Sequence, residues 1–153
     1  MVTSNQVNCV MSLRLIEHNS AEYEAMIALR MKILREPLGL SFTPDDLQKE
    51  KDDILLCAFE DDVIVACCIL TKVNNNTCQL RQMAVMPSVQ KNGLGRSLLD
   101  FAEKIAYDAG FRKIIMHARK SAVGFYQKQG YEIVGGEFEE VTIPHYEMQK
   151  SLI

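Results

Sequence analysis

A strand, a two-glycine loop and a long amphipathic helix follow one another between residues 81 and 110, and this stretch constrains the fold most strongly. The loop reads Gln-Lys-Asn-Gly-Leu-Gly over residues 90–95, and Gly93 and Gly95 remove side chains where a ligand must approach the backbone closely. N–H groups in the first turn of a helix lack partners within it, and the helix dipole makes that end positive. The sequence therefore predicts a phosphate- or pyrophosphate-binding helix N-terminus.

The helix that follows this loop has one apolar face. Leu94, Leu98, Phe101 and Ile105 recur at helical spacing, and Gly110 is typical of the residue just after a helix. We expect that face to pack on a sheet and to hold the N-terminus of the helix in a fixed place.

The glycine loop differs from two better-known phosphate-binding motifs. No Gly-Lys-Ser/Thr follows its second glycine, and the Gly-x-Gly-x-x-Gly pattern of dinucleotide-binding folds is absent. Taken alone, Gln-x-x-Gly-x-Gly after a strand also fits an ordinary glycine-broken turn.

A second motif, Ser-Ala-Val-Gly-Phe-Tyr-Gln-Lys-Gln-Gly-Tyr, occupies residues 121–131 and reads as a short helix. A strand-like segment, Lys113 to Ala118, separates it from the first motif. In this order and at this spacing, the two motifs resemble those of the GNAT superfamily, the acyl-CoA-dependent N-acyltransferases. The resemblance spans at least residues 80–143.

The resemblance implies that acetyl-CoA is a co-substrate bound at the glycine loop and along the strand before it. A backbone N–H of that strand would pair with the pantetheine arm and stabilise the oxyanion. Arg119 stands where GNAT proteins often have Asn, so its contact with the cofactor departs from the family pattern. The expected cofactor-binding residues are Met83, Ala84, Val85, Gln90, Lys91, Asn92, Gly93, Leu94, Gly95, Arg96, Ser97, Arg119 and Lys128.

Tyr126 occupies the general-acid position of the superfamily, with a tyrosine that only packs as the alternative. For the general base we select His145, because Ile-Pro-His resembles a short signature in part of the superfamily. A chain of waters would serve as well. The other candidates for the base are His117, Glu139, Glu140 and Glu147.

The resemblance implies an N-acetyltransferase that moves an acetyl group from acetyl-CoA to the primary amine of a small molecule, by direct attack through a tetrahedral intermediate. Two alternatives remain: a peptide or protein N-acetyltransferase, and a non-catalytic acyl-CoA-binding sensor domain. Retention of Tyr126 and of an intact glycine loop argues against the sensor.

Arg30 and Phe42 are the expected acceptor-binding residues. Arg30 falls on the apolar face of a helix capped at Asn19 or Ser20, where a cation needs a partner; a side chain reaching water at the edge of that face is the alternative. Phe42 lies in a segment broken by two prolines and a glycine, and in GNAT-like chains the segment after the first helix commonly lines the acceptor site.

The chain has the length of one domain, residues 1–153, with residues 1–11 expected to form a flexible tail. We expect an α/β (α+β) fold of the GNAT type: a mixed, mostly antiparallel sheet of about seven strands flanked by about four helices. The expected strands are residues 12–17, 53–59, 63–73, 77–86, 113–118, 131–140 and 143–150.

The composition excludes several classes of function. The net charge of −3 gives no basic footprint for nucleic acid or an anionic membrane, and it suits a cationic substrate. Five cysteines without a Cys-x-x-Cys motif indicate reduced thiols in a cytoplasmic protein, with no metal site. The longest apolar run, residues 63–70, is far shorter than the roughly 20 residues that cross a bilayer. A homodimer is compatible with all of this.

Overall fold

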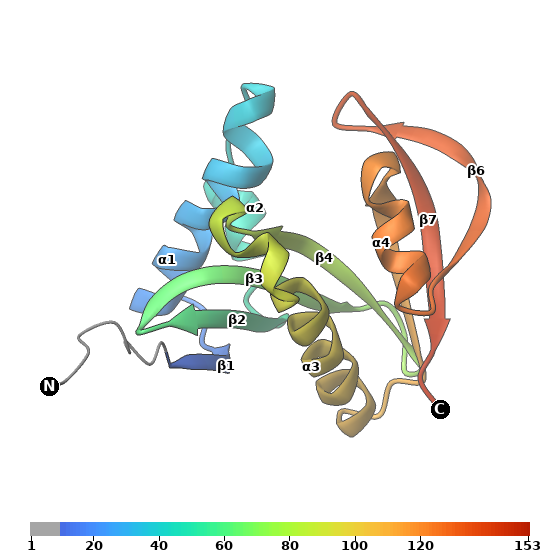
Figure 1. Ribbon diagram of the computed structural model, residues 1–153, viewed down its shortest axis with the longest axis horizontal. Helices are drawn as coiled ribbons and strands as arrows, with labels where there is room; N and C mark the ends of the chain where they lie inside the picture. The colour runs from blue at the N-terminus through green and yellow to red at the C-terminus, as the bar shows by residue number, and fades with distance from the viewer. Residues whose placement is uncertain (1–9) are drawn as a thin grey trace, which may run out of the picture.

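A seven-stranded sheet carries helices on both faces in the computed structural model, which describes residues 10–153 apart from the side chains of residues 91 and 92 (Figure 1). Its strand order is β1-β2-β3-β4-β5-β7-β6, and only the β4–β5 pair is parallel. The strands are β1 (Met11–Ile16), β2 (Ile54–Glu60), β3 (Val63–Lys72), β4 (Thr77–Val85), β5 (Lys113–Arg119), β6 (Glu132–Glu140) and β7 (Ile143–Ser151). The predicted mixed, mostly antiparallel sheet is confirmed.

Four α-helices and four shorter helical turns connect the strands. The α-helices are α1 (Ala21–Arg30), α2 (Pro44–Gln48), α3 (Leu94–Asp108) and α4 (Val123–Lys128). The turns are η1 (Met31–Arg35), η2 (Glu36–Leu38), η3 (Pro87–Asn92) and η4 (Lys120–Ala122); η1 is a π-helix and the others are 3₁₀-helices.

Every strand lies within two residues of its expected bounds, because turn chemistry and alternation mark the ends clearly. Both tight hairpins have two residues with positive φ, Asp61 and Asp62 in one and Val141 and Thr142 in the other. Primed turns of this kind match the right-handed twist of antiparallel strands. The expected tail needs one correction, since Met11 already belongs to β1; residues 1–9 lie outside the described part of the chain.

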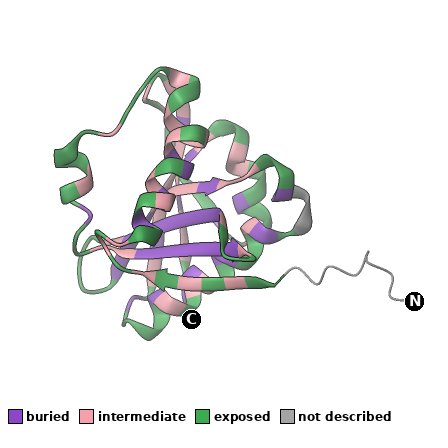
Figure 2. Ribbon diagram, turned by 90° about the vertical axis from the view of Figure 1, so that its left-hand side faces the viewer, coloured by how far each residue is buried: buried purple, intermediate pink, exposed green. Residues whose placement is uncertain are grey.

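Strands β2 and β3 contribute side chains to two separate hydrophobic cores, one on each face of the sheet. Leu56 and Ala58 of β2 point to the face covered by α3, while Leu55, Cys57 and Phe59 point to the face covered by α1. Because successive side chains of a strand alternate between faces, a strand buried on both sides is apolar throughout. Figure 2 shows the result as continuous purple stretches in the middle of the sheet.

The cysteines belong to these cores. Cys57, Cys67, Cys68 and Cys78 are free and buried, while Cys9 lies outside the described residues. Burial raises the pKa of Cys78 to about 11 and that of Cys57 to about 12, so both thiols are protonated at neutral pH. None of the helices in residues 10–153 has both the length and the apolar character needed to cross a bilayer.

Helix α1 begins at one of the two expected N-caps and continues into a π-turn at its other end. Ser20 alone is its N-cap and accepts a hydrogen bond from the Tyr23 N–H at 3.1 Å, whereas Asn19 precedes it with a φ of 64°. At the other end the chain continues as the π-helix η1 before the proline at residue 37 interrupts it. This extra turn carries the side chains of residues 33–35 toward the sheet.

Arg30 is fully buried, so the expectation that it reaches water or substrate is wrong. Its Nη1 and Nη2 donate to the two carboxylate oxygens of Glu50 at 2.8 and 2.7 Å. The Tyr23 hydroxyl donates to the same carboxylate at 2.6 Å. A buried cation requires a counter-charge and hydrogen-bond partners, and Glu50 supplies both. The pair also connects α1 to the residues just after α2.

Replacing one partner of this pair should destabilise the protein strongly. Glu50→Gln keeps the size of the side chain but leaves the Arg30 cation buried without a counter-charge, so we expect the free energy of unfolding to fall by about 3–5 kcal/mol. Urea denaturation measures the change.

The matched control is Asp108→Asn, the same chemical change at the exposed Lys104–Asp108 pair of α3, where the two charged atoms lie 2.8 Å apart. An exposed pair of this kind contributes less than about 1 kcal/mol. Equal losses in the two variants would show that the buried pair has no special role in stability.

Candidate active site

Strands β4 and β5 separate halfway along their length, and the separation opens a cleft. Their parallel pairing ends at Leu80 and Met116. On the other side of β4, three residue steps from Arg81 to Ala84 face only two steps of β3, so β4 contains a β-bulge. Gln82, within the bulge, has a φ of 55°. A bulge bends its strand and can end pairing on that edge, which explains why β4 turns away from β5 here.

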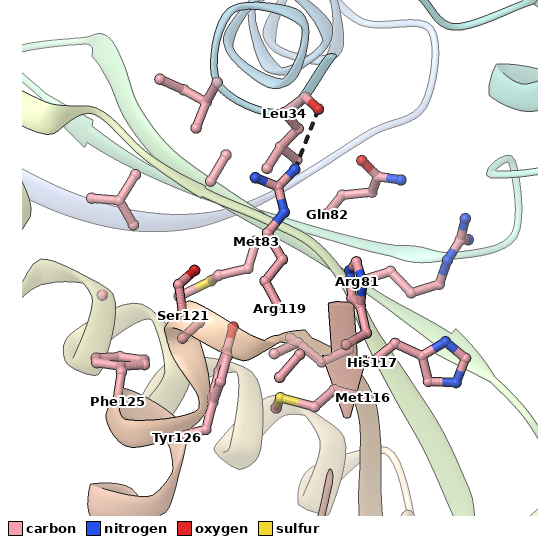
Figure 3. A pocket seen from close by; sticks show the side chains of 18 of the residues that line it. Leu34, Arg81, Gln82, Met83, Met116, His117, Arg119, Ser121, Phe125 and Tyr126 are labelled. Atoms are coloured by element: carbon pink, nitrogen blue, oxygen red, sulfur yellow. Dashed lines mark hydrogen bonds between the residues drawn. The ribbon is translucent and has the colours of Figure 1, made fainter. Parts of the chain in front are cut away.

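The cleft has a volume of about 820 Å³ and is lined by segments that lie far apart in the sequence, from Ile33 to His145. One wall is the second half of β4 with η1, and the other is the end of β5 with α4 and β7. The N-terminus of α3 closes one end. Figure 3 shows side chains from these walls directed into the space between β4 and β5.

The cleft wall formed by β4 presents backbone hydrogen-bonding groups that β5 does not use. The Met86 N–H donates to the Val65 carbonyl at 2.8 Å, so alternation turns the N–H and C=O of Val85 away from β3 and into the cleft. The Gln90 side chain donates to the Val85 carbonyl at 3.1 Å. An extended ligand arm could therefore pair with this edge as an additional strand.

The N-terminus of α3 has the features of an anion site. Its N-cap, Gly93, has a φ of 70° and no side chain, and the first turn contains no acidic residue. The Ser97 N–H donates to the Gly93 carbonyl and so makes the first i to i−4 hydrogen bond of the helix. The N–H groups of the three residues before it, Leu94, Gly95 and Arg96, come too early in the helix to make such a bond. These donors and the helix dipole together suit a phosphate group.

Gly95 is closely packed. A Cβ at this position would lie 3.4 Å from Cζ of Phe125 and 3.8 Å from Cγ2 of Val85. Glycine therefore lets the start of α3, β4 and α4 approach one another. A larger side chain would have to displace the Phe125 ring or project toward the cleft.

Tyr126 of α4 faces the middle of the cleft. Figure 3 shows its hydroxyl oxygen directed into the space between Ser121 and Arg119. Tyr126 is only 6% exposed, and burial raises the pKa of the phenol, which therefore remains protonated and able to donate. Phe125 and Tyr131 hold the ring edge-on, with centroids at 5.1 and 5.9 Å.

His145 of β7 is buried and positioned as a hydrogen-bond acceptor. Its Nδ1 lies 2.8 Å from the Ile143 carbonyl, which can only accept, so Nδ1 carries the hydrogen and Nε2 of the neutral ring has a free lone pair. A Glu140 oxygen lies 3.8 Å from that Nε2. The other oxygen of Glu140 accepts from Nδ1 of His117 at 2.9 Å. One carboxylate therefore lies close to both histidines.

The structure brings together most of the residues predicted for the site. Those that line the cleft are Met83, Ala84, Val85, Gln90, Gly93, Gly95, Arg96, Arg119, Tyr126 and His145. Leu94 directs its side chain into the core, and Lys128 lies on the exposed last turn of α4. The Ser97 hydroxyl donates to the Gly93 carbonyl instead of facing the cleft. The side chains of Lys91 and Asn92 lie outside the described part of the structure.

The two residues predicted to bind the acceptor do not line the cleft. Arg30 is bound to Glu50, and the ring of Phe42 lies beneath the guanidinium groups of Arg30 and Arg35, 4.4 and 4.6 Å from their central carbons. The segment after α1 does reach the cleft, but through Arg35 and its neighbours in η1, because the π-turn extends the helix.

Sequence reasoning missed Arg35, Arg81 and Gln82, which all line the cleft. The polar pair Arg81-Gln82 interrupts the alternation of β4 and was the one local signal for the bulge. No comparable signal marked Arg35, because the π-turn that positions it depends on tertiary packing.

Comparisons with known proteins agree with this geometry. The model of the acetyltransferase (GNAT) family matches residues 20–131. The Bacillus subtilis proteins YyaT, named as an uncharacterized protein, and YjcF, named as an uncharacterized N-acetyltransferase, are 33% and 30% identical over 53% and 69% of this chain. The matches cover 55% of YyaT and 74% of YjcF, so the chain spans about half the length of the first of these relatives.

A solved structure shows the same fold. The aminoglycoside 6'-N-acetyltransferase complexed with coenzyme A superposes with a TM-score of 0.76 at 17% sequence identity, covering 93% of this chain and 97% of the other. The sheet, the split between β4 and β5 and the family match together show that this chain belongs to the GNAT family of acetyltransferases.

Proposed function

We propose that this protein transfers the acetyl group of acetyl-CoA to the primary amine of a small molecule, and that it does so in the cytoplasm. The observation that carries the proposal is the cleft, in which an anion-binding helix terminus, a free strand edge and two proton-transfer candidates face one space. The four described cysteines, all reduced and buried, support the location.

The chain fits acetyl-CoA along one continuous path. The N–H groups at the start of α3 would hold the pyrophosphate, with Arg96 beside them, and the cleft-facing edge of Met83–Val85 would pair with the pantetheine arm. Bound in this way, acetyl-CoA would supply an activated acetyl group at the bulge of β4.

The acceptor amine must lose a proton before it can attack. An alkylammonium with a pKa near 10 costs about 4 kcal/mol to deprotonate at pH 7. Nε2 of His145 would accept that proton, directly or through one water, and the nearby Glu140 carboxylate would stabilise the imidazolium that results. The hydrogen bond from Nδ1 to the Ile143 carbonyl holds the ring in the tautomer that this role requires.

Tyr126 would supply a proton to the departing thiolate. Its hydroxyl is directed into the cleft and its pKa is raised by burial, so the group is protonated at neutral pH. Because a thiol of pKa near 8.5 is already a tolerable leaving group, we expect a contribution at the low end of the usual range for general acids.

A thiol-release assay with acetyl-CoA and a panel of amines tests the function directly. We expect small primary amines to accelerate thiol release, with the N-acetylated product visible by mass spectrometry. Release only with peptides would instead favour a peptide or protein acceptor. Tight acetyl-CoA binding without release for any amine or peptide would favour a sensor domain.

The glycine loop provides a test of cofactor binding. In Gly95→Val a branched side chain would enter the packed region between α3, Phe125 and Val85, so we expect acetyl-CoA affinity measured by calorimetry to fall at least tenfold, about 1.4 kcal/mol. Gly136→Val is the matched control, because a Cβ at residue 136 would meet no atom within 4 Å and the φ there is not positive. Unchanged affinity in the Gly95 variant would remove the loop from the site.

The two proton transfers can be tested by substitutions that keep size and remove one function. Tyr126→Phe and His145→Gln should each lower kcat by about 10²-fold while acetyl-CoA affinity changes little, since each group acts in the reaction and not in cofactor binding. Single-turnover measurements separate this effect from slow product release.

His117→Gln serves as the control for the base, because this second histidine shares Glu140 but is more exposed, with 32% of its side chain accessible. A larger loss in His117→Gln than in His145→Gln would transfer the base role to His117. A kcat within about threefold of the parent in Tyr126→Phe, under 1 kcal/mol, would make Tyr126 a packing residue.

A further inference from the structure

Besides Arg96 at the start of α3, three arginines line the cleft that holds the proposed active site. They are Arg35 from η1, Arg81 from β4 and Arg119 from the end of β5. A protein with a net charge of −3 thus concentrates positive charge in this cleft. We call these three residues the arginine cluster.

Arg35 is charged, but no carboxylate among the described residues hydrogen-bonds to its guanidinium. None of their side chains or carbonyls hydrogen-bonds to its guanidinium, and its Nε is buried without a partner. Its central carbon lies 4.6 Å from the centre of the Phe42 ring, which holds the group in place. Burial and the charges of Arg30, Arg119 and Arg81 lower its pKa, but a guanidinium remains protonated at neutral pH.

The other two arginines are only weakly engaged. Arg119 donates one long hydrogen bond, 3.4 Å, from Nη2 to the Leu34 carbonyl. Arg81 reaches Thr71 at 3.4 Å and lies 3.9 Å from an Asp53 oxygen. Each guanidinium has five N–H donors, so most donors of the arginine cluster have no partner of good geometry within the described residues.

Acidic groups do not balance this charge. Asp53 is nearly buried, and burial raises its pKa, which weakens it as a counter-ion. The charge of Asp46, on α2, acts to raise the pKa of Arg35, but the Asp46 carboxylate already accepts from the Thr43 backbone N–H as part of a capping box. Glu140 lies on the histidine side of the cleft and accepts from His117 at 2.9 Å.

The arginine cluster lies at the end of the cleft away from the proposed pyrophosphate site. Val85 is the β4 residue next to Gly95, and Arg81 lies four residues earlier, about 13 Å along an extended strand. Figure 3 shows the Arg119 guanidinium reaching toward Leu34, on the opposite side from Phe125, whose ring packs on Gly95. The arginine cluster therefore lies away from the site proposed for the cofactor phosphates.

We propose that the acceptor is a small primary amine that also carries a carboxylate, and that Arg35, Arg81 and Arg119 bind this carboxylate. The inference rests on the proposed function and names the substrate class of the same site. Planar guanidinium groups match carboxylate oxygens in paired hydrogen bonds, which add geometric specificity to the charge attraction.

The same charges would assist the chemistry. A nearby cation disfavours the ammonium form of the acceptor, so the arginine cluster lowers the pKa of the bound amine and reduces the cost of its deprotonation. Amines with several positive charges and no anionic group would be repelled. The cluster thus selects against polyamines while it favours zwitterionic amino acids.

Matched pairs of acceptors test the inference in the thiol-release assay: glycine against glycinamide, β-alanine against β-alaninamide, and phenylalanine against phenylalaninamide. We expect kcat/KM to be at least tenfold higher for the carboxylate in one or more pairs. In Arg35→Gln that preference should fall below threefold. Lys104→Gln, the loss of an exposed cation on α3, is the control and should keep the full preference.

Three results would overturn the inference. The first is equal rates for carboxylates and amides in every pair. The second is a tenfold loss of acetyl-CoA affinity in Arg35→Gln, which would assign the arginine cluster to the cofactor. The third is a preference for 2-aminoethyl phosphate over all the carboxylates, which would replace the carboxylate with a phosphate.

A binding measurement separates failure of this inference from failure of the proposed function. Calorimetry would compare N-acetyl-β-alanine with its amide on the CoA-saturated protein, which requires no turnover. Tighter binding of the carboxylate, lost in Arg35→Gln, supports the anion site even if no amine in the panel is acetylated. Equal binding of the two compounds overturns it, whatever the assay shows about acetyl transfer.

Discussion

The β-bulge in β4 is the feature on which the site depends. One extra residue opposite β3 places Gln82 at a positive φ and ends the pairing of β4 with β5 at Leu80. Without the bulge, β4 and β5 would continue as neighbours and bury the backbone groups that now face the cleft. The apolar packing of β3 on both faces supplies the rigid frame against which β4 can bend.

The buried pair of Arg30 and Glu50 has a corresponding role for η1, which forms the rest of the same wall. It anchors the end of α1, and the π-turn that follows presents Arg35 to the cleft. Phe42 lies against both guanidinium groups, yet only Arg30 has a carboxylate partner. Two arginines five residues apart thus have different roles, since one satisfies its charge inside the protein and the other is available to a ligand.

The sequence predicted the strands, the glycine loop and the cleft-facing Tyr126 and His145, because local patterns determine each of them: alternation, turn residues, helix-start glycines and two short motifs. The sequence-based prediction failed for features that depend on packing between distant segments. The partner of Arg30 is twenty residues away, so the helix pattern alone placed that side chain at a surface or a substrate. Likewise, the bulge arises from the register in which β3 and β4 pair. The sequence of either strand alone does not determine that register.

Overall charge was the least informative of the sequence features about the substrate. A net charge of −3 suited a cationic acceptor, whereas the cleft carries Arg35, Arg81 and Arg119. Interactions between charges weaken over about 10 Å at ordinary ionic strength, so distant surface carboxylates hardly affect a ligand inside the cleft. Recognition there is governed by the few groups within hydrogen-bonding reach. For an enzyme that must bind an amine and also remove its proton, local positive charge is useful only if the substrate brings a negative group of its own.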